Sequence, residues 1–136
     1  MSTVAQAMRK DLNKTAHDTS VAKAAELMRD GQVGSLLVEQ DGKRGEIIGI
    51  VTETDIVRRA VAGESDLSTM TVQSIMTSPV ATIESIRTIQ DAHDMMADLG
   101  VRHLGVTQGG TFVGLVSVRD LLVSFKSVSE PKITQD

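Results

Sequence analysis

Two short stretches of this chain carry the residue types best suited to binding chemistry, and they share one pattern. The first is GIVTETD at residues 49–55, and the second is GLVSVRD at residues 114–120. Each contains a glycine, two aliphatic residues, a hydroxyl residue and, three positions after the hydroxyl, an aspartate. The hydroxyl–carboxylate pairs are Thr52 with Asp55 and Ser117 with Asp120.

The residues around each pair predict a strand that leads directly into a helix. The two aliphatic residues are typical of a strand end, and Ile56–Ala62 has apolar residues at helical spacing, with Gly63 as a stop. The hydroxyl residue is therefore predicted to be the helix N-cap, and the aspartate the third helical residue. The predicted buried stripes are Ile56, Val57, Ala60 and Val61 in the first copy and Leu121, Leu122 and Phe125 in the second.

This arrangement supports two interpretations that are compatible with each other. A hydroxyl residue followed three positions later by an acid resembles a capping box, here with Asp in place of Glu. A helix N-terminus also attracts phosphate, and a carboxylate beside it can accept hydrogen bonds from both hydroxyls of a ribose diol. Two copies at the same offset favour a ligand role in addition to the cap.

The amino-acid composition limits the classes of function that this chain could have. The chain has 136 residues, 40% of them hydrophobic, which is enough for a core, and it has no run of eighteen apolar residues. There is no cysteine, so disulfides, zinc–thiolate sites and thiol catalysis are excluded. A net charge of −4 and an aromatic content of 1% disfavour nucleic-acid and anionic-membrane binding. The polar N-terminus lacks a signal-peptide pattern, so we expect a cytoplasmic protein.

The sequence gives no support for catalysis. It shows no Ser-His-Asp constellation and no glycine-rich phosphate loop. His93 lies between Asp91 and Asp94, but these acids are only three positions apart and no second histidine is near, so no metal site is predicted. We therefore expect a protein that is not an enzyme.

A repeat extends well beyond the two motifs. At an offset of 68 residues, Val4 aligns with Val72, Met8 with Met76 and Met28 with Met96. The motifs themselves are 65 residues apart, and one shorter loop accounts for the difference. This pattern predicts a duplicated unit, with repeat 1 at residues 1–66, repeat 2 at residues 67–128 and a flexible polar tail at residues 129–136.

Each repeat is predicted to have the order β-α-β-β-α after a short helical lead-in that ends at Met8 or Met76. The predicted helices are Ser20–Arg29, capped by Ser20 and ended by Gly31, and Thr88–Asp98. The predicted strands are 14–16, 35–38 and 46–51 in repeat 1 and 81–83, 101–106 and 111–116 in repeat 2, with turns at 41–42 and 109–110. The fold class is therefore α+β, an α/β-like sandwich of two tandem repeats.

Two tandem units of this kind, each ending in glycine, two aliphatics, Thr or Ser, and Asp before a helix, resemble a pair of CBS domains, a Bateman module. The resemblance covers residues 4–126 and includes the helix pattern Ser20, Val21, Ala24 and Met28 and the strand Val101–Val106. It implies two repeats related by pseudo-twofold symmetry. It also implies a regulatory module that binds adenosine-containing ligands (AMP, ADP, ATP, NAD or S-adenosylmethionine) in one or both clefts between the repeats.

The resemblance assigns roles to individual residues. Asp55 and Asp120 are expected to bind the ribose, with Thr52 and Ser117 beside ribose or phosphate. The expected adenine-edge positions are Thr15, Ala16, Thr82 and Ile83. The expected phosphate contacts are Arg102 and His103, followed by Arg58, Arg119 and Lys126. Repeat 1 has Gly34-Ser35 where repeat 2 has Arg102-His103, so the two sites are not expected to be equivalent.

The expected ligand is AMP or ATP, optionally with magnesium, and no catalytic cofactor is expected. The helices after Asp55 and Asp120 carry more apolar residues than one unit can cover, which predicts a homodimer packed through them. The regulated partner is a separate, unidentified protein. The alternative function is a ligand-free structural or dimerisation module, in which the motif residues act only as caps.

Overall fold

The computed structural model describes residues 2–40 and 46–128, with side chains described up to Ser124. The turn predicted at residues 41–42 and the polar tail predicted at residues 129–136 lie outside the described residues. The chain divides into two compact units. We call Leu12–Val80 the first unit, and Met1–Asp11 together with Ala81–Asp136 the second unit.

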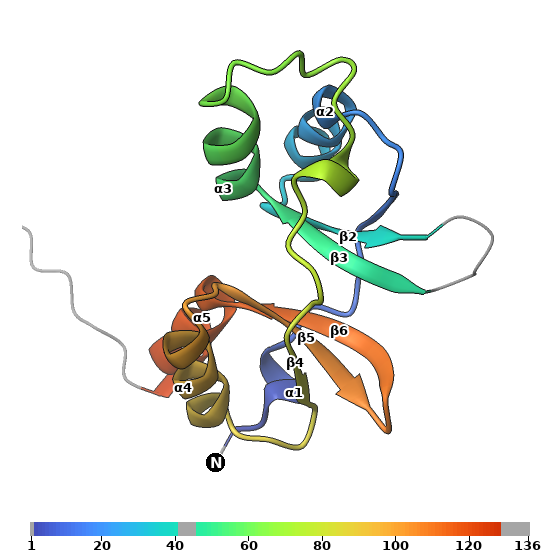
Figure 1. Ribbon diagram of the computed structural model, residues 1–136. Helices are drawn as coiled ribbons and strands as arrows, with labels where there is room; N and C mark the ends of the chain where they lie inside the picture. The colour runs from blue at the N-terminus through green and yellow to red at the C-terminus, as the bar shows by residue number, and fades with distance from the viewer. Residues whose placement is uncertain (1, 41–45, 129–136) are drawn as a thin grey trace, which may run out of the picture. The chain divides into compact units, whose positions relative to one another are not determined.

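The first unit is a three-stranded sheet with helices packed on it (Figure 1). Strand β2 lies in the middle, parallel to β1 and antiparallel to β3. The elements, in chain order, are β1 Lys14–Ala16, α2 Val21–Gly31, β2 Ser35–Glu39, β3 Ile47–Thr52, α3 Glu53–Asp55, the π-helix η1 Ile56–Val61 and the 3₁₀-helix η2 Val72–Ser74.

The second unit repeats this architecture. Strand β5 lies in the middle of its sheet, parallel to β4 and antiparallel to β6. The elements are α1 Val4–Ala7, β4 Thr82–Glu84, α4 Ile89–Leu99, β5 His103–Gln108, β6 Thr111–Ser117 and α5 Val118–Val128. The fold class and the repeated strand–helix order predicted from the sequence are thus confirmed.

The short lead-in of each repeat packs in the unit formed by the other repeat. Helix α1 belongs to the second unit, where Val4 is fully buried and its N–H donates to the carbonyl of Arg87 at 2.8 Å. Helix η2 belongs to the first unit, where the N–H of the buried Val72 donates to the carbonyl of Thr19 at 2.9 Å. The hydrophobic core of each unit therefore contains residues from both repeats.

The long helices form where the apolar spacing predicts them. Helix α2 buries Val21, Ala24 and Met28 on one face, and Ser20 caps it by accepting a hydrogen bond from the N–H of Lys23. Helix α4 repeats this with Ile89, Ala92 and Met96 buried. These residues share one face because helical positions three and four apart lie above one another.

Two details differ from the sequence prediction. Gly31 was expected to end α2, but it is the last helical residue, and Gln32 adopts the left-handed cap conformation with φ 54°. The predicted helix after Asp55 is a π-helix, in which the N–H of Ala62 donates to the carbonyl of Val57, five residues back.

The predicted buried stripes are only partly buried. Ile56 and Ala60 are covered by the unit, whereas Val57 and Val61 are 59% and 54% exposed. In α5, Leu121 is buried and Leu122 is 61% exposed, and the side chain of Phe125 lies outside the described residues. In both helices, therefore, the unit buries one row of apolar side chains and leaves the neighbouring row exposed.

Candidate functional site

The first motif forms the predicted strand–helix junction. Thr52 ends β3 and caps the next helix: its N–H donates to Asp55 Oδ2 at 3.0 Å, and its Oγ1 accepts from the N–H of Asp55 at 3.1 Å. The Asp55 side chain is 10% exposed. The N-cap position of Thr52 and the third-position carboxylate are confirmed.

The second motif forms the same junction at the start of α5. Ser117 donates to Asp120 Oδ2 through its N–H at 2.9 Å and through its Oγ at 3.0 Å. The N–H of Asp120 donates back to Ser117 Oγ at 3.2 Å. The Asp120 side chain is 11% exposed. In both motifs the cap uses Oδ2 of the carboxylate, so Oδ1 remains for another partner.

The lead-ins run alongside the motif strands. In the second unit, Arg9 and Leu115 exchange both backbone hydrogen bonds, at 2.8 and 3.0 Å. In the first unit, Thr77 and Ile50 do the same, at 2.8 and 2.9 Å. Because of this pairing, the residue after each lead-in methionine lies beside a motif.

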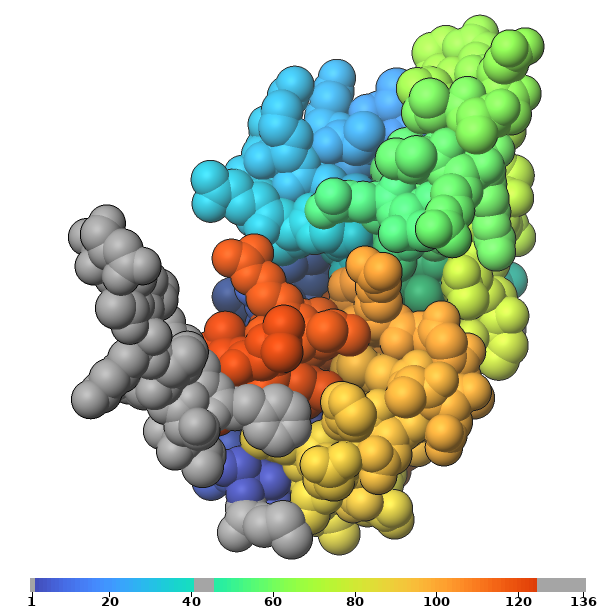
Figure 2. Space-filling view, turned by 90° about the vertical axis from the view of Figure 1, so that its left-hand side faces the viewer, coloured from blue at the N-terminus to red at the C-terminus, as the bar shows by residue number. Residues whose placement is uncertain are grey.

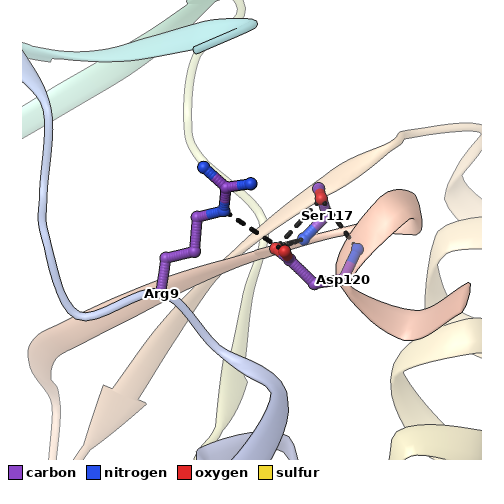
Figure 3. A network of polar contacts seen from close by, with 3 residues as sticks. All are labelled: Arg9, Ser117 and Asp120. Carbon is purple, nitrogen blue, oxygen red and sulfur yellow. Dashed lines mark hydrogen bonds and ion pairs between the residues drawn. The ribbon is translucent and has the colours of Figure 1, made fainter. Parts of the chain in front are cut away.

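An arginine approaches Oδ1 of each motif aspartate. Arg9 Nε donates to Asp120 Oδ1 at 3.2 Å, as Figure 3 shows together with the Ser117 contacts. Arg59 Nε lies 3.8 Å from Asp55 Oδ1. Sequence reasoning identified neither Arg9 nor Arg59 as a partner of a motif aspartate. The one signal for Arg9 was its position directly after the repeated lead-in methionine, Met8.

The predicted adenine-edge residues lie on the first strand of each sheet. In β1, Thr15 is buried and its Oγ1 donates to Thr19 Oγ1 at 2.8 Å, while Ala16 is half-buried and pairs with Glu39 of β2. In β4, Thr82 is exposed and pairs with Gly105 of β5, and Ile83 is buried. Each pair lies in the same unit as the motif aspartate of its own repeat.

The predicted phosphate residues do not share one environment. His103 starts β5 directly opposite Ser117 in the strand register, and is half-buried. Arg102 is exposed, accepts a backbone hydrogen bond from Val118 and lines a groove between α4 and α5. Arg58 and Arg119 are exposed, and the side chain of Lys126 lies outside the described residues.

A third capping box provides an internal reference away from the motifs. At the start of α4, Asp91 Oδ2 accepts from the N–H of Thr88 at 3.2 Å and from Arg87 Nε at 3.1 Å. The hydrogen bonds from Thr88, with a smaller contribution from Arg87, lower the pKa of the Asp91 carboxyl below its usual range. Its side chain is 37% exposed.

Metal ligands do not gather in the described part of the chain, where no three His, Asp or Glu side chains form a group that could hold an ion. His93 Nδ1 lies 3.3 Å from Asp94 Oδ1 on the exposed side of α4. None of the described helices has the length and apolar content needed to cross a bilayer.

The model of the CBS domain family matches the chain twice, at residues 4–62 and 72–127. The chain therefore belongs to the CBS domain family and carries a tandem pair of these domains, as the motif resemblance indicated. Pairs of CBS domains are commonly regulatory modules.

Three relatives illustrate this relationship. A candidate signal-transduction protein with CBS domains from Burkholderia ambifaria is 32% identical, with a TM-score of 0.89 over 98% of this chain and 100% of that one. The hexameric CBS-CP12 protein from bloom-forming cyanobacteria is 30% identical, with a TM-score of 0.83 over 96% of this chain and 76% of that one. The mitochondrial CBS domain-containing protein CBSX3 of Arabidopsis thaliana is 32% identical over 108 residues, or 77% of this chain.

The relatives include longer proteins. The chain spans 60% of the length of a protein from Methanopyrus kandleri, 61% of one from Acidianus ambivalens and 52% of CBSX3.

Proposed function

We propose that this CBS pair is a regulatory module that binds an adenosine-containing ligand through its motif aspartates. Asp55 and Asp120 accept hydrogen bonds from ribose hydroxyls, and Thr52 and Ser117 lie beside the ribose or its phosphate. His103 and Arg102 are further phosphate contacts, and the strand residues Thr15, Ala16, Thr82 and Ile83 lie at the adenine edge. The proposed ligands are AMP and ATP, the latter optionally with magnesium.

The observation that carries this proposal is the burial of the motif carboxylates. Asp55 and Asp120 are 10% and 11% exposed, whereas the cap carboxylate of Asp91 is 37% exposed. Burying a carboxylate costs free energy, and the Asp91 cap forms without that cost. A cap alone therefore does not require the burial seen twice at the motifs. A carboxylate that presents one oxygen to a ribose does benefit from reduced competition by water.

The Asp91 cap also provides a control for testing this proposal. Thermal unfolding of the wild type, D55A, D120A and D91A is followed with AMP, ADP, ATP, NAD and S-adenosylmethionine. A ligand present at a hundred times its dissociation constant should stabilise the wild type by about 2.7 kcal/mol. We expect D55A or D120A to lose this ligand-induced shift and D91A to keep it, although all three variants lose a cap.

The opposite outcomes are equally clear. If none of the five ligands shifts the wild-type transition, the ligand-free structural module becomes the better interpretation. If the ligand shift survives in both D55A and D120A, the ligand binds without the motif carboxylates, and the proposed site is wrong.

Ligand binding exerts control by favouring one conformation or assembly state over another. The regulated partner is a separate protein, and the cysteine-free sequence agrees with a cytoplasmic setting. No interaction with nucleic acid or membrane is part of the proposal.

We further propose that the chain forms a homodimer through its exposed helix faces. In the second unit, a groove of about 370 Å³ between α4 and α5 is lined by apolar residues that include Met96, Val101 and Leu121. Leu122 and Val123 are 61% and 63% exposed, and Leu99 on α4 is 56% exposed. Figure 2 looks onto this face, where α5 (red) adjoins α4 (yellow to orange). Apolar surface of this kind marks a contact site.

The same surface favours the second candidate function, a dimerisation module without a ligand. The ligand screen separates the two, because a pure dimerisation module gains no stability from any adenosine-containing ligand.

A further inference from the structure

The two motif aspartates differ in the arginine that approaches them. Arg9, which pairs with Asp120, comes from the lead-in and lies 111 residues away in sequence. Arg59, which lies near Asp55, comes from the same helical segment as its partner, four residues later. The positive charge at the two motif aspartates therefore comes from different elements: the lead-in at Asp120 and the following helix at Asp55.

The repeat itself explains this difference. The lead-in positions that pair with the motif strands are Arg9 in one unit and Thr77 in the other. These residues are equivalent at the repeat offset of 68. The same backbone geometry thus presents a guanidinium beside Asp120 and a neutral hydroxyl residue in the unit that contains Asp55.

Arg59 is held differently from Arg9, because one of its two terminal nitrogens, Nη1, is already bonded to the backbone. Arg59 Nη1 donates to the carbonyl of Ile75 at 3.1 Å and to that of Met76 at 3.4 Å. This arginine ties the end of the lead-in to the motif helix. It is a structural contact of the first unit.

Arg9, in contrast, keeps its terminal nitrogens for another partner. Its Nε–Asp120 bond is its one side-chain hydrogen bond within the described part of the chain. The side chain is 51% exposed, and its two terminal nitrogens point away from Asp120 in Figure 3. The carboxylate fixes the guanidinium through Nε and leaves its outer edge open.

We propose that Arg9 makes the Asp120 site selective for a ligand with a negatively charged group, namely a nucleotide rather than a nucleoside. This inference rests on the proposed function and adds the charge class of the ligand at one of its two sites. Asp120 holds the ribose hydroxyls, and Arg9 binds the 5′-phosphate through its terminal nitrogens. Arginine suits this task because its planar fork donates two parallel hydrogen bonds to phosphate oxygens.

Preorganisation adds to the effect. Asp120 already holds the arginine side chain in one orientation, so less conformational entropy is lost when a phosphate binds. At the Asp55 site the arginine Nε lies farther from the carboxylate, at 3.8 Å, and Nη1 is bonded to the backbone, so this site should distinguish nucleotides from nucleosides less strongly.

The test compares AMP with adenosine by isothermal titration calorimetry on the full chain. Affinities are read for the site that D120A removes, in the wild type, R9Q, R9K and R87Q. The R87Q variant is a matched control because Arg87 pairs through Nε with the cap carboxylate Asp91 at 3.1 Å, in the same unit. It removes the same charge and the same kind of ion pair.

We expect R9Q to weaken AMP binding by about tenfold or more, the loss typical of a hydrogen bond to a charged group. Adenosine binding should stay within about threefold of the wild type, because adenosine makes no contact with the terminal nitrogens of Arg9. R9K should retain part of the preference for AMP, since it keeps the charge without the fork. R87Q should bind both ligands like the wild type.

Three results would overturn the inference while leaving the proposed function intact. R9Q could bind AMP as tightly as the wild type does, which would remove Arg9 from the phosphate. An equal loss for AMP and adenosine would make Arg9 a support for Asp120 only. Tighter binding of both ligands would mean that Arg9 competes with the sugar. If instead the wild type bound neither ligand, or D120A removed no site, the proposed function itself would fail.

Discussion

Gly114 lies against Met8, and no side chain larger than hydrogen fits between them. A Cβ placed on Gly114 would lie 2.6 Å from Met8 Sδ and 2.8 Å from the carbonyl oxygen of Arg9. Gly49 has the same relationship with the other lead-in, at 2.5 Å from Met76 Sδ and 2.9 Å from the carbonyl oxygen of Thr77. The motif glycine is therefore required where the lead-in backbone pairs with the motif strand.

This contact predicts that G114A and G49A are destabilised by about 1–3 kcal/mol, the usual cost of overpacking a filled site. The methionine side chain can rotate away from a new methyl group, but the carbonyl oxygen is held by the backbone pairing with the motif strand. Urea denaturation monitored by circular dichroism measures the change in unfolding free energy.

A matched control is G31A. A Cβ on Gly31 would meet only Val33 Cγ2, at an ordinary contact distance of 3.7 Å, and the residue lies in the last turn of α2. Gly to Ala at such a position is neutral or stabilising by about 0.4–1 kcal/mol. Equal stability of G114A and G31A would show that the lead-in tolerates displacement from Gly114.

The part of the site that depends on local geometry could be predicted from the sequence. Thr52 with Asp55 and Ser117 with Asp120 are three residues apart, so their reciprocal hydrogen bonds follow from local helix geometry. The Ser20 cap of α2 was predicted on the same basis. Such features depend on neighbours in sequence, which a single chain displays directly.

Other features depend on tertiary structure and could not be predicted in this way. Arg9 reaches Asp120 only because the lead-in of repeat 1 packs in the unit of repeat 2. Hydrophobic periodicity identified Val57 and Leu122 as apolar helix residues, but it does not distinguish residues covered by their own sheet from those left exposed. The left-handed conformation of Gln32 had no signal, because the adjacent Gly31 was the more probable residue for it.

The capping role of the motif hydroxyls gives a second prediction. S117A and T88A should each be destabilised by about 0.5–2 kcal/mol, because each removes the acceptor for a backbone N–H at a helix start. The two acceptor contacts are similar, at 3.2 Å to the N–H of Asp120 and 3.0 Å to that of Asp91. Urea denaturation measures both. If S117A cost nothing while T88A was destabilised, Ser117 would not act as a cap.

The Asp91 cap predicts a pH dependence. Its pKa is lowered because the native state stabilises the charged carboxylate, through Thr88 first and Arg87 second. Its contribution to stability is therefore fully present above the pKa of an unfolded aspartate and is lost as the pH falls through the lowered native value. The free-energy difference between wild type and D91N should be largest near neutral pH and shrink at the acid end.

Carboxyl chemical shifts of Asp91, followed by NMR during an acid titration, provide the direct measurement. The pKa read from the midpoint should lie below 3.8, the ordinary value for an aspartate carboxyl. A midpoint at or above that value would mean that the Thr88 hydrogen bonds do not persist in solution.

The exposed helix faces predict the assembly state. L122E places a charge on an apolar face where Leu122 is 61% exposed and borders the groove between α4 and α5. If two copies pack through this face, the buried charge must be desolvated, and we expect L122E to sediment as a monomer at micromolar concentrations where the wild type is a dimer. I86E is the matched control, because Ile86 is 80% exposed but lies between β4 and α4, and is not among the residues that line the groove. I86E should remain a dimer. Sedimentation of L122E as a dimer, or dissociation of both variants to the same extent, would place the interface on another surface.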